Sequence, residues 1–206
     1  MVRSRGRKPE CRAAFGLLAA ALVAPPPALG ATEWQIRPFA GVTFGGGTTL
    51  NDPDLAVGKP NLVLGVSGGL LGDIVGIEAD VGHAPGFFQT GDGTLVSSSR
   101  VTTFTGNVIL GLPRRATEYS LRPYFVGGLG VMRAHAVDSL GDAVPVDMTR
   151  PAFDLGGGLG GALSNRTGLS WELRYFRSFR GKVDPLGVGL ERLSFWRANM
   201  AVVIRL

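Results

Sequence analysis

The sequence is poor in the residues that catalysis and metal binding most often use. It has one cysteine, Cys11, and two histidines, His83 and His135, among 206 residues. Because Cys11 lies in the first thirty residues, the rest of the chain has no disulfide, no thiol nucleophile and no cysteine metal site. The two histidines are too few and too distant in sequence to indicate a metal centre. We therefore predict no metal and no other cofactor.

Long apolar runs are also missing, except near the N-terminus. No stretch reaches the roughly eighteen uninterrupted apolar residues of a transmembrane helix. The apolar run 13–24 follows a basic start and precedes PPPALGA, which is the order of a secretory signal peptide. A buried or amphipathic helix is the alternative, but it would need a polar side that this run lacks. We predict a signal peptide over 1–30, cut before Ala31, and one domain over 31–206.

Excess charge disappears once this segment is removed. The segment holds five of the 21 Lys and Arg residues and one of the 16 Asp and Glu residues, which leaves 16 against 15, a net charge of +1. The basic pI therefore belongs mainly to the signal peptide, and we expect no nucleic-acid partner. Lysine is scarcer still, because only Lys59 and Lys182 remain, both in long connections.

The chain does have a regular pattern in which apolar residues recur at every second position. In eight stretches, apolar residues alternate with small or polar ones, as they do when successive side chains of a strand point to opposite faces. These stretches are 33–44, 61–71, 74–82, 101–112, 121–132, 153–163, 169–176 and 194–206. The last one continues its alternation to Leu206, the final residue. The sequence therefore predicts eight strands and an all-β fold.

The connections between these stretches alternate between short and long. The short ones are 71–73, 113–120 and 164–168, and the other four are long and rich in Gly, Asp, Ser and Pro. This alternation is typical of an up-and-down antiparallel sheet whose two ends face different environments. Eight strands can also close on themselves, which removes exposed edges. The predicted fold is an eight-stranded antiparallel up-and-down barrel with both termini at the short-turn end.

A closed barrel does not by itself determine which face of its strands, the apolar or the polar one, points outward. In an exported soluble barrel of the lipocalin type the apolar face points inward around a small ligand, whereas in an outer-membrane barrel it points outward to lipid. A water-facing surface is about a quarter to a third Lys, Arg, Glu and Asp. Here the polar face is mainly Gly, Ser, Thr and Asn with isolated charges. This composition favours a transmembrane β-barrel.

Residues 33–206 resemble the small eight-stranded outer-membrane barrels, the group that includes the OmpA transmembrane domain, OmpX and OmpW. The resemblance rests on the signal peptide, EWQIRPFAGVTFGG, EADVGHAPGFF, RPYFVGGLG, FDLGGGLGGAL and the terminal alternating strand. It implies a monomer in the outer membrane of a Gram-negative-type cell, in contact with outer-membrane lipids and lipopolysaccharide. The expected role is structural or interaction-bearing, with long extracellular loops.

The resemblance also gives the final strand a role. In this group the final strand is similar to the signal that the barrel-assembly machinery reads. The matching residues here are Trp196, Met200, Val202, Ile204 and Leu206. The terminal residue is most often Phe in such proteins, whereas here it is Leu206, which puts the strength of recognition in doubt.

Some barrels of this group modify lipid A, and the deacylase type has His and Ser two residues apart on one strand. That spacing turns the base and the nucleophile to the same face. Neither His83 nor His135 has a serine two residues later. We predict that the protein is not an enzyme.

The mixed face would carry nine charged residues into the lumen. These are Arg37, Arg122, Arg174, Arg197, Arg205, Glu78, Asp80, Asp154 and Glu172. Because a buried charge without a partner costs several kcal/mol, we expect a paired network that plugs the barrel. The alternative is a narrow pore for ions or small solutes built from the same groups. Strand register decides which arginine meets which acid, and the sequence does not fix it.

Aromatic residues mark two further regions. Trp34, Trp171, Tyr175 and Trp196 fall on apolar faces, where such rings gather at the membrane interface, although ordinary packing is the alternative. Phe87 and Phe88 begin the second long connection, where they would either contact a partner or extend the strands.

Overall fold

The computed structural model describes residues 32–48, 60–87, 96–113, 121–138, 146–179 and 193–206. The predicted signal peptide, Lys59, Phe88 and Lys182 lie outside these residues. The described residues form eight strands. They are β1 (Glu33–Thr48), β2 (Asn61–Leu71), β3 (Val75–Pro85), β4 (Val96–Gly111), β5 (Leu121–Asp138), β6 (Val146–Ala162), β7 (Thr167–Ser178) and β8 (Leu193–Arg205).

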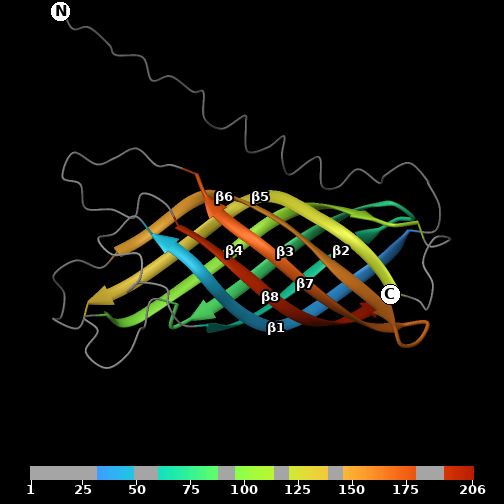
Figure 1. Cartoon of the computed structure of the whole chain (residues 1–206), viewed down its shortest axis with the longest axis horizontal. Helices are drawn as coiled ribbons and strands as arrows, with labels where there is room; N and C mark the ends of the chain where they lie inside the picture. Colours follow the sequence, from blue (N-terminus) through green and yellow to red (C-terminus); the bar gives the residue numbers. More distant parts are fainter. Residues whose placement is uncertain (1–31, 49–59, 88–95, 114–120, 139–145, 180–192) are drawn as a thin grey trace, which may run out of the picture.

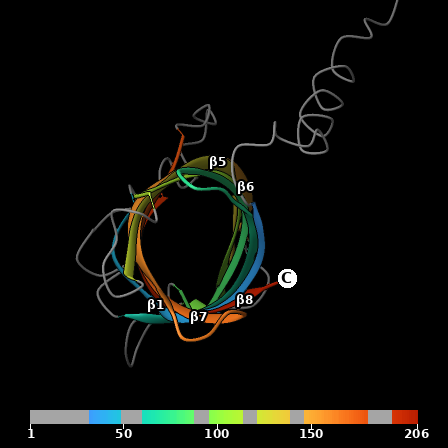
Figure 2. The same cartoon turned by 90° about the vertical axis from the view of Figure 1, so that its right-hand side faces the viewer.

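The strands close into a barrel. Each strand pairs antiparallel with the next, and β8 pairs with β1 (Figure 1). Viewed from one end, they form a ring (Figure 2). The predicted eight-stranded antiparallel up-and-down barrel is confirmed. No helix among the described residues is long and apolar enough to cross a membrane.

The start of β1, the end of β8 and the described turns β2–β3 and β6–β7 gather at one end of the barrel. In the turn between β6 and β7, the Ser164 hydroxyl accepts a hydrogen bond from the backbone N–H of Thr167 at 3.2 Å. The N–H of Leu206 donates to the carbonyl of Trp34 at 3.0 Å, so the last residue takes part in closing the sheet. We call this end the turn end and the opposite one the loop end.

Three neighbouring strands are longer than the alternation predicted. β4, β5 and β6 have 16, 18 and 17 residues, and the additional residues lie toward the loop end, at 96–100, 133–138 and 146–152. The outward residues of these segments include Arg100, Arg133 and Thr149, whereas Ala134 and Ala152 are buried in an inner apolar cluster. The backbones of these segments pair with one register shift, between Val96 and Ser98, because ladder hydrogen bonds need no particular side chain. The barrel wall is therefore taller over β4–β6.

Apolar side chains point outward and polar ones inward. In β3 exposed and buried residues alternate without exception along the strand. Phe125, Leu129 and Leu155 are 73%, 64% and 62% exposed, whereas Arg174 and Arg197 are 1% exposed. A lipocalin-type barrel requires the opposite orientation. The alternative of a soluble barrel with an apolar lumen is therefore wrong for this structure.

The interior is layered along the barrel axis. A large apolar cluster lies toward the loop end and includes Phe39, Phe176 and Phe195. A small one, with Ile109 and Val126, lies toward the turn end. Most of the inward charges lie between these two clusters. The candidate site is accordingly the lumen itself.

Candidate functional site

Arg174 on β7 is the centre of the buried charges. Its Nε donates to Glu172 Oε1 at 2.5 Å, its Nη1 to Asp154 Oδ2 at 3.2 Å and its Nη2 to Glu78 Oε1 at 2.6 Å. A guanidinium offers five N–H donors in a planar fork, so one arginine can serve three carboxylates. Arg174 thereby ties β7 to β6 and, across the lumen, to β3.

Two more arginines complete the arrangement. Arg197 of β8 binds both oxygens of Asp80 on β3, at 2.9 and 3.0 Å, and Arg37 of β1 pairs with Glu78. All of these side chains are almost fully buried. We call the seven residues the lumen charge cluster: Arg37, Glu78, Asp80, Asp154, Glu172, Arg174 and Arg197. The structure thus brings together seven of the charges that the sequence placed on inward faces.

The cluster has four carboxylates and three arginines, which leaves one negative charge when all are ionised. Neutral donors face these carboxylates. Asn107 Nδ2 donates to Glu78 at 3.1 Å, and Glu172 accepts from the Tyr124 hydroxyl at 2.9 Å and from Asn199 Nδ2 at 3.4 Å. Hydrogen bonds to an ionised acceptor are the stronger kind, so they stabilise the carboxylate in excess.

Inward glycines leave room for the long arginine side chains. A Cβ on Gly82 would lie 2.7 Å from Nη1 of Arg197 and 3.0 Å from the Thr103 hydroxyl. A Cβ on Gly156 would lie 2.8 Å from Cγ of Arg174. An eight-stranded barrel is just wide enough for side chains to fill it. Small residues therefore make room for arginines both from a non-adjacent strand, as Gly82 does for Arg197, and from the neighbouring strand, as Gly156 does for Arg174.

An aromatic layer packs inside the lumen on the loop side of the cluster. The rings of Phe176 and Phe195 stack with centroids 5.2 Å apart, and Phe195 meets Phe87 edge-on at 5.0 Å. The Arg197 guanidinium lies between two rings, 4.6 Å from the centroid of Phe39 and 4.7 Å from that of Phe176. We call Phe39, Phe87, Phe176 and Phe195 the aromatic layer; none of them is more than 6% exposed.

This layer was not predicted from the sequence, although the sequence contains a signal for it. Phe176 and Phe195 lie two residues from inward arginines, at positions 174 and 197, and therefore share their face. Phe39 likewise lies on the mixed face of β1. The suggestion that Phe87 is open to a partner on a loop is wrong, because its side chain is buried against Phe195.

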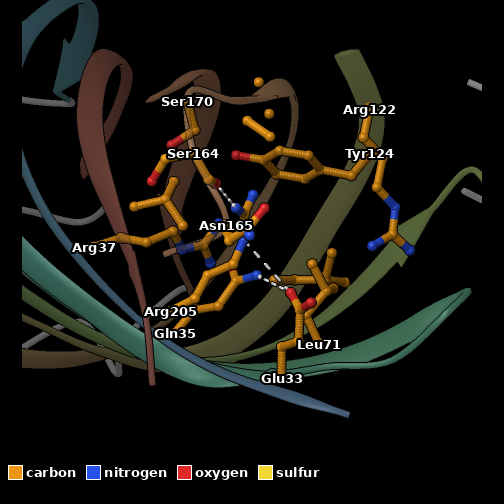
Figure 3. A pocket seen from close by; sticks show the side chains of 15 residues that line it. Glu33, Gln35, Arg37, Leu71, Arg122, Tyr124, Ser164, Asn165, Ser170 and Arg205 are labelled. Carbon is orange, nitrogen blue, oxygen red and sulfur yellow. Dashed lines mark hydrogen bonds and ion pairs between the residues drawn. The ribbon is translucent and has the colours of Figure 1, made fainter. Parts of the chain in front are cut away.

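On the turn side of the cluster the lumen holds a polar cavity of about 580 Å³ (Figure 3). Its lining includes Glu33, Gln35, Arg37, Tyr124, Ser170 and Arg205. Nε of Arg205 lies 3.5 Å from Glu33 Oε2, and its Nη1 donates to the carbonyl of Ser164 at 3.0 Å. A cavity of this size and polarity has room for several water molecules.

Arg122 lies outside the lumen charge cluster, which corrects the prediction that grouped it with the other inward charges. Its Nε donates to the carbonyl of Leu112 at 2.9 Å, and its Nη2 to the carbonyls of Gly72 and Asp73 at 3.1 and 2.6 Å. Arg122 is the second residue of β5, so it lies at the rim, within reach of turn carbonyls. The period of two indicates the face of a residue but not its depth.

The four aromatic residues that were predicted for the membrane interface all face outward. Trp34, 59% exposed, begins β1 at the turn end, whereas Tyr175 and Trp196 are cross-strand partners with rings 5.1 Å apart nearer the loop end. Trp171 lies between these two levels on β7. Their place at the membrane interface stays a prediction.

The final strand pairs on both sides, with β7 and with β1. The residues that were predicted as its assembly signal, which are Trp196, Met200, Val202, Ile204 and Leu206, are all exposed on the outer surface. Recognition by the assembly machinery stays a prediction. No group of three or more His, Cys, Asp or Glu side chains suited to a metal occurs in the described part of the chain.

Comparison with solved structures identifies the fold. Neisserial surface protein A is 13% identical, with a TM-score of 0.61 over 85% of this chain and 99% of that one. The N-terminal β-barrel domain of Pseudomonas aeruginosa OprF is 16% identical, with a TM-score of 0.56 over 86% and 100% of the two chains. Ail, the attachment invasion locus protein of Yersinia pestis, is 9% identical, with a TM-score of 0.52 over 86% and 100%.

No family model matches this chain, and no curated protein matches its sequence. At identities of 9–16% the likeness to solved structures concerns the fold alone. The protein has the fold of the small eight-stranded outer-membrane β-barrels, the class that its sequence resembles.

Proposed function

We propose that the protein is an integral outer-membrane β-barrel with a structural or interaction role, exported by its N-terminal segment and closed to solutes along its lumen. The observation that carries this proposal is the inverted barrel wall, apolar outside and charged inside. Leaving apolar surface in water costs about 25 cal/mol per Å². A bilayer removes that cost, and a closed barrel leaves no backbone group unpaired in lipid.

The same arrangement suggests the partners. Outer-membrane lipids and lipopolysaccharide surround the wall, and the barrel-assembly machinery reads β8 during insertion. We infer that the barrel is a monomer; because β1 pairs with β8, the sheet offers no free edge for strand pairing with a second copy. We infer that the loop end of the barrel faces the outside of the cell and carries any specific interaction.

The closed lumen is supported by two successive barriers. The lumen charge cluster crosses the barrel from β3 to β7 and β8, and the aromatic layer packs above it. A narrow pore is the second candidate, favoured by the 580 Å³ cavity at the turn end. That cavity, however, has Arg37 and Tyr124 of the buried interior in its lining, so it ends where the cluster begins.

Gel mobility tests insertion most simply. The chain from residue 31 is refolded in detergent micelles and run in SDS with and without boiling. A closed membrane barrel resists cold SDS and migrates differently from its boiled form. Identical mobility, together with full solubility when detergent is withheld, would contradict the proposal and indicate a water-soluble barrel.

A further inference from the structure

A basic patch lies on the outer surface at the loop end of three neighbouring strands. It consists of His83 on β3, Arg100 and Thr102 on β4, and Arg133 and His135 on β5. In the register, His83 is opposite Thr102, Thr102 is opposite Arg133, and Arg100 is opposite His135. Directly opposite residues share a face, so the five side chains form one surface.

This patch forms the wall nearer the loop end in a pocket of about 370 Å³. The remaining lining residues are Phe104 and Val131, cross-strand partners one step nearer the turn end, which are 53% and 43% exposed. Cationic and hydrogen-bonding groups thus lie next to apolar ones, on their loop-end side. Such a pocket fits an amphiphile with an anionic head and a hydrocarbon tail.

Two groups of the patch, Arg100 and His83, are exposed and placed to donate to an anion. The Arg100 side chain makes no hydrogen bond or ion pair with the described residues, although its backbone pairs within the sheet. The His83 ring is held by Thr102, with Nδ1 and Oγ1 2.9 Å apart, and Nδ1 of His135 is buried without a hydrogen-bond partner in the described part of the chain. Arg133 already has an interaction within the chain and contributes charge to the lining.

The charge balance of the patch favours an anionic ligand. Among the described residues, no carboxylate lines the pocket. In the register, Asp147 on β6 is the cross-strand partner of His135. An arginine on the lipid side is unfavourable at the bilayer midplane but costs little near the interface. The patch therefore belongs at the level of the lipid headgroups.

We propose that this pocket binds a phosphate of lipopolysaccharide, the phosphorylated lipid of the outer leaflet. Arg100 and His83 donate to the phosphate, with His135 beside them in the lining, because guanidinium and phosphate match in geometry and charge. One acyl chain lies along Phe104 and Val131. The proposal rests on the proposed function, since only an inserted barrel brings this patch to the headgroups. Free phosphate could bind the same basic groups as the lipid headgroup, but it has no hydrocarbon part to contact the apolar side of the pocket.

Native mass spectrometry of the refolded chain in detergent micelles tests this. The probes are lipid A with both phosphates and the same lipid after enzymatic dephosphorylation. The phosphorylated lipid is expected to bind about tenfold or more tightly, because hydrogen bonds between charged groups are strong enough for such a factor. Equal binding of the two lipids would overturn the proposal, as would displacement of lipid A by an equimolar amount of inorganic phosphate.

Two variants locate the site. Arg100→Gln is expected to reduce the preference for the phosphorylated lipid, and His83→Gln to reduce it less. Arg177→Gln is the matched control, because Arg177 lies on β7 at the loop end but outside the pocket. The proposal is overturned if Arg177→Gln lowers the preference as much as Arg100→Gln does.

Heat-dependent gel mobility, measured on the same samples, separates the two proposals. If the wild type shows no shift, the outer-membrane proposal itself fails. If the shift is normal and the phosphate preference is absent, only the lipid site fails. Both substituted side chains are exposed, so neither variant is expected to lose the shift.

Discussion

The inner and outer surfaces of the barrel wall differ as strongly as the core and the surface of a soluble protein, but in the reverse order. On β4, Asn107 is 4% exposed and donates a hydrogen bond to Glu78, whereas the next residue, Val108, is 49% exposed. On β7, buried Arg174 follows exposed Leu173. Soluble proteins place these residue types the other way round. Changing one surface at a time tests what each contributes to stability.

The largest effect is expected inside, from Arg174→Met. Removing the guanidinium leaves Glu78, Asp154 and Glu172 buried without their shared cation. Breaking a buried ion pair from one side costs about 3–5 kcal/mol, so the free energy of unfolding should fall by that amount. Urea unfolding of the barrel in lipid vesicles measures it.

Arg177→Met is the control for this change, since Arg177 is on the same strand but faces outward and is partly exposed. It should alter the unfolding free energy by no more than about 0.5 kcal/mol. Equal losses for the two variants would mean that the lumen charge cluster has no special part in stability.

The next effect is expected outside, from Val108→Arg. If this face meets lipid near the middle of the bilayer, the arginine should cost about 2–4 kcal/mol. The matched variant is Leu163→Arg, because Leu163 is 70% exposed in the turn after β6, where an arginine should cost about 0–1 kcal/mol. The same urea titration, run in vesicles, compares them. Similar unfolding free energies for both variants would show that depth does not matter and that lipid does not cover the face.

A smaller effect should come from adding one methyl group to either surface. Gly82→Ala places Cβ against the Arg197 guanidinium and should cost about 1–3 kcal/mol by overpacking. Gly68→Ala adds the same group where its nearest neighbour is 3.8 Å away, and should stay within about 0.5 kcal/mol of wild type. Thermal unfolding in detergent compares the pair. A costly Gly68→Ala with a neutral Gly82→Ala would reverse the assignment of the two faces.

The smallest effect is expected at the turn end. Arg205 and Glu33 pair at 3.5 Å, and their side chains are 20% and 27% exposed to the cavity. Because water screens such a pair, Arg205→Gln should cost less than about 1 kcal/mol. Its urea midpoint should therefore lie close to that of wild type. A loss as large as that of Arg174→Met would show that the cavity is as dry as the cluster.

The fold followed from the sequence because each predicted strand carries its own signal. Alternation such as that of Leu206, Ile204 and Val202 needs no partner to be recognised, and the short turns fix the order of the strands. The polar ends of β4–β6 were missed for the opposite reason. Ser98, Ser99 and their neighbours pair through the backbone, and nothing in their side chains distinguishes them from loop residues.

The lumen could be predicted only in part. Period two identifies inward residues, so Arg174 and Asp80 were found. It does not give their height, and Arg122 was therefore grouped with charges that lie deeper. The aromatic layer depends on which inward phenylalanines reach the same level from different strands, and this is set by register. Register in turn depends on the geometry of each turn and on the pairing of β1 with β8, which are distant in sequence.

Planar-bilayer conductance is the most direct test of the central claim, an inverted barrel whose lumen is closed by charges and rings. The refolded wild-type chain, shown by its gel shift to be a closed barrel, is inserted into a lipid bilayer under voltage. The account predicts a silent bilayer with no discrete current steps. Steady unitary currents from the wild type would contradict it and would make the lumen charge cluster the lining of a pore.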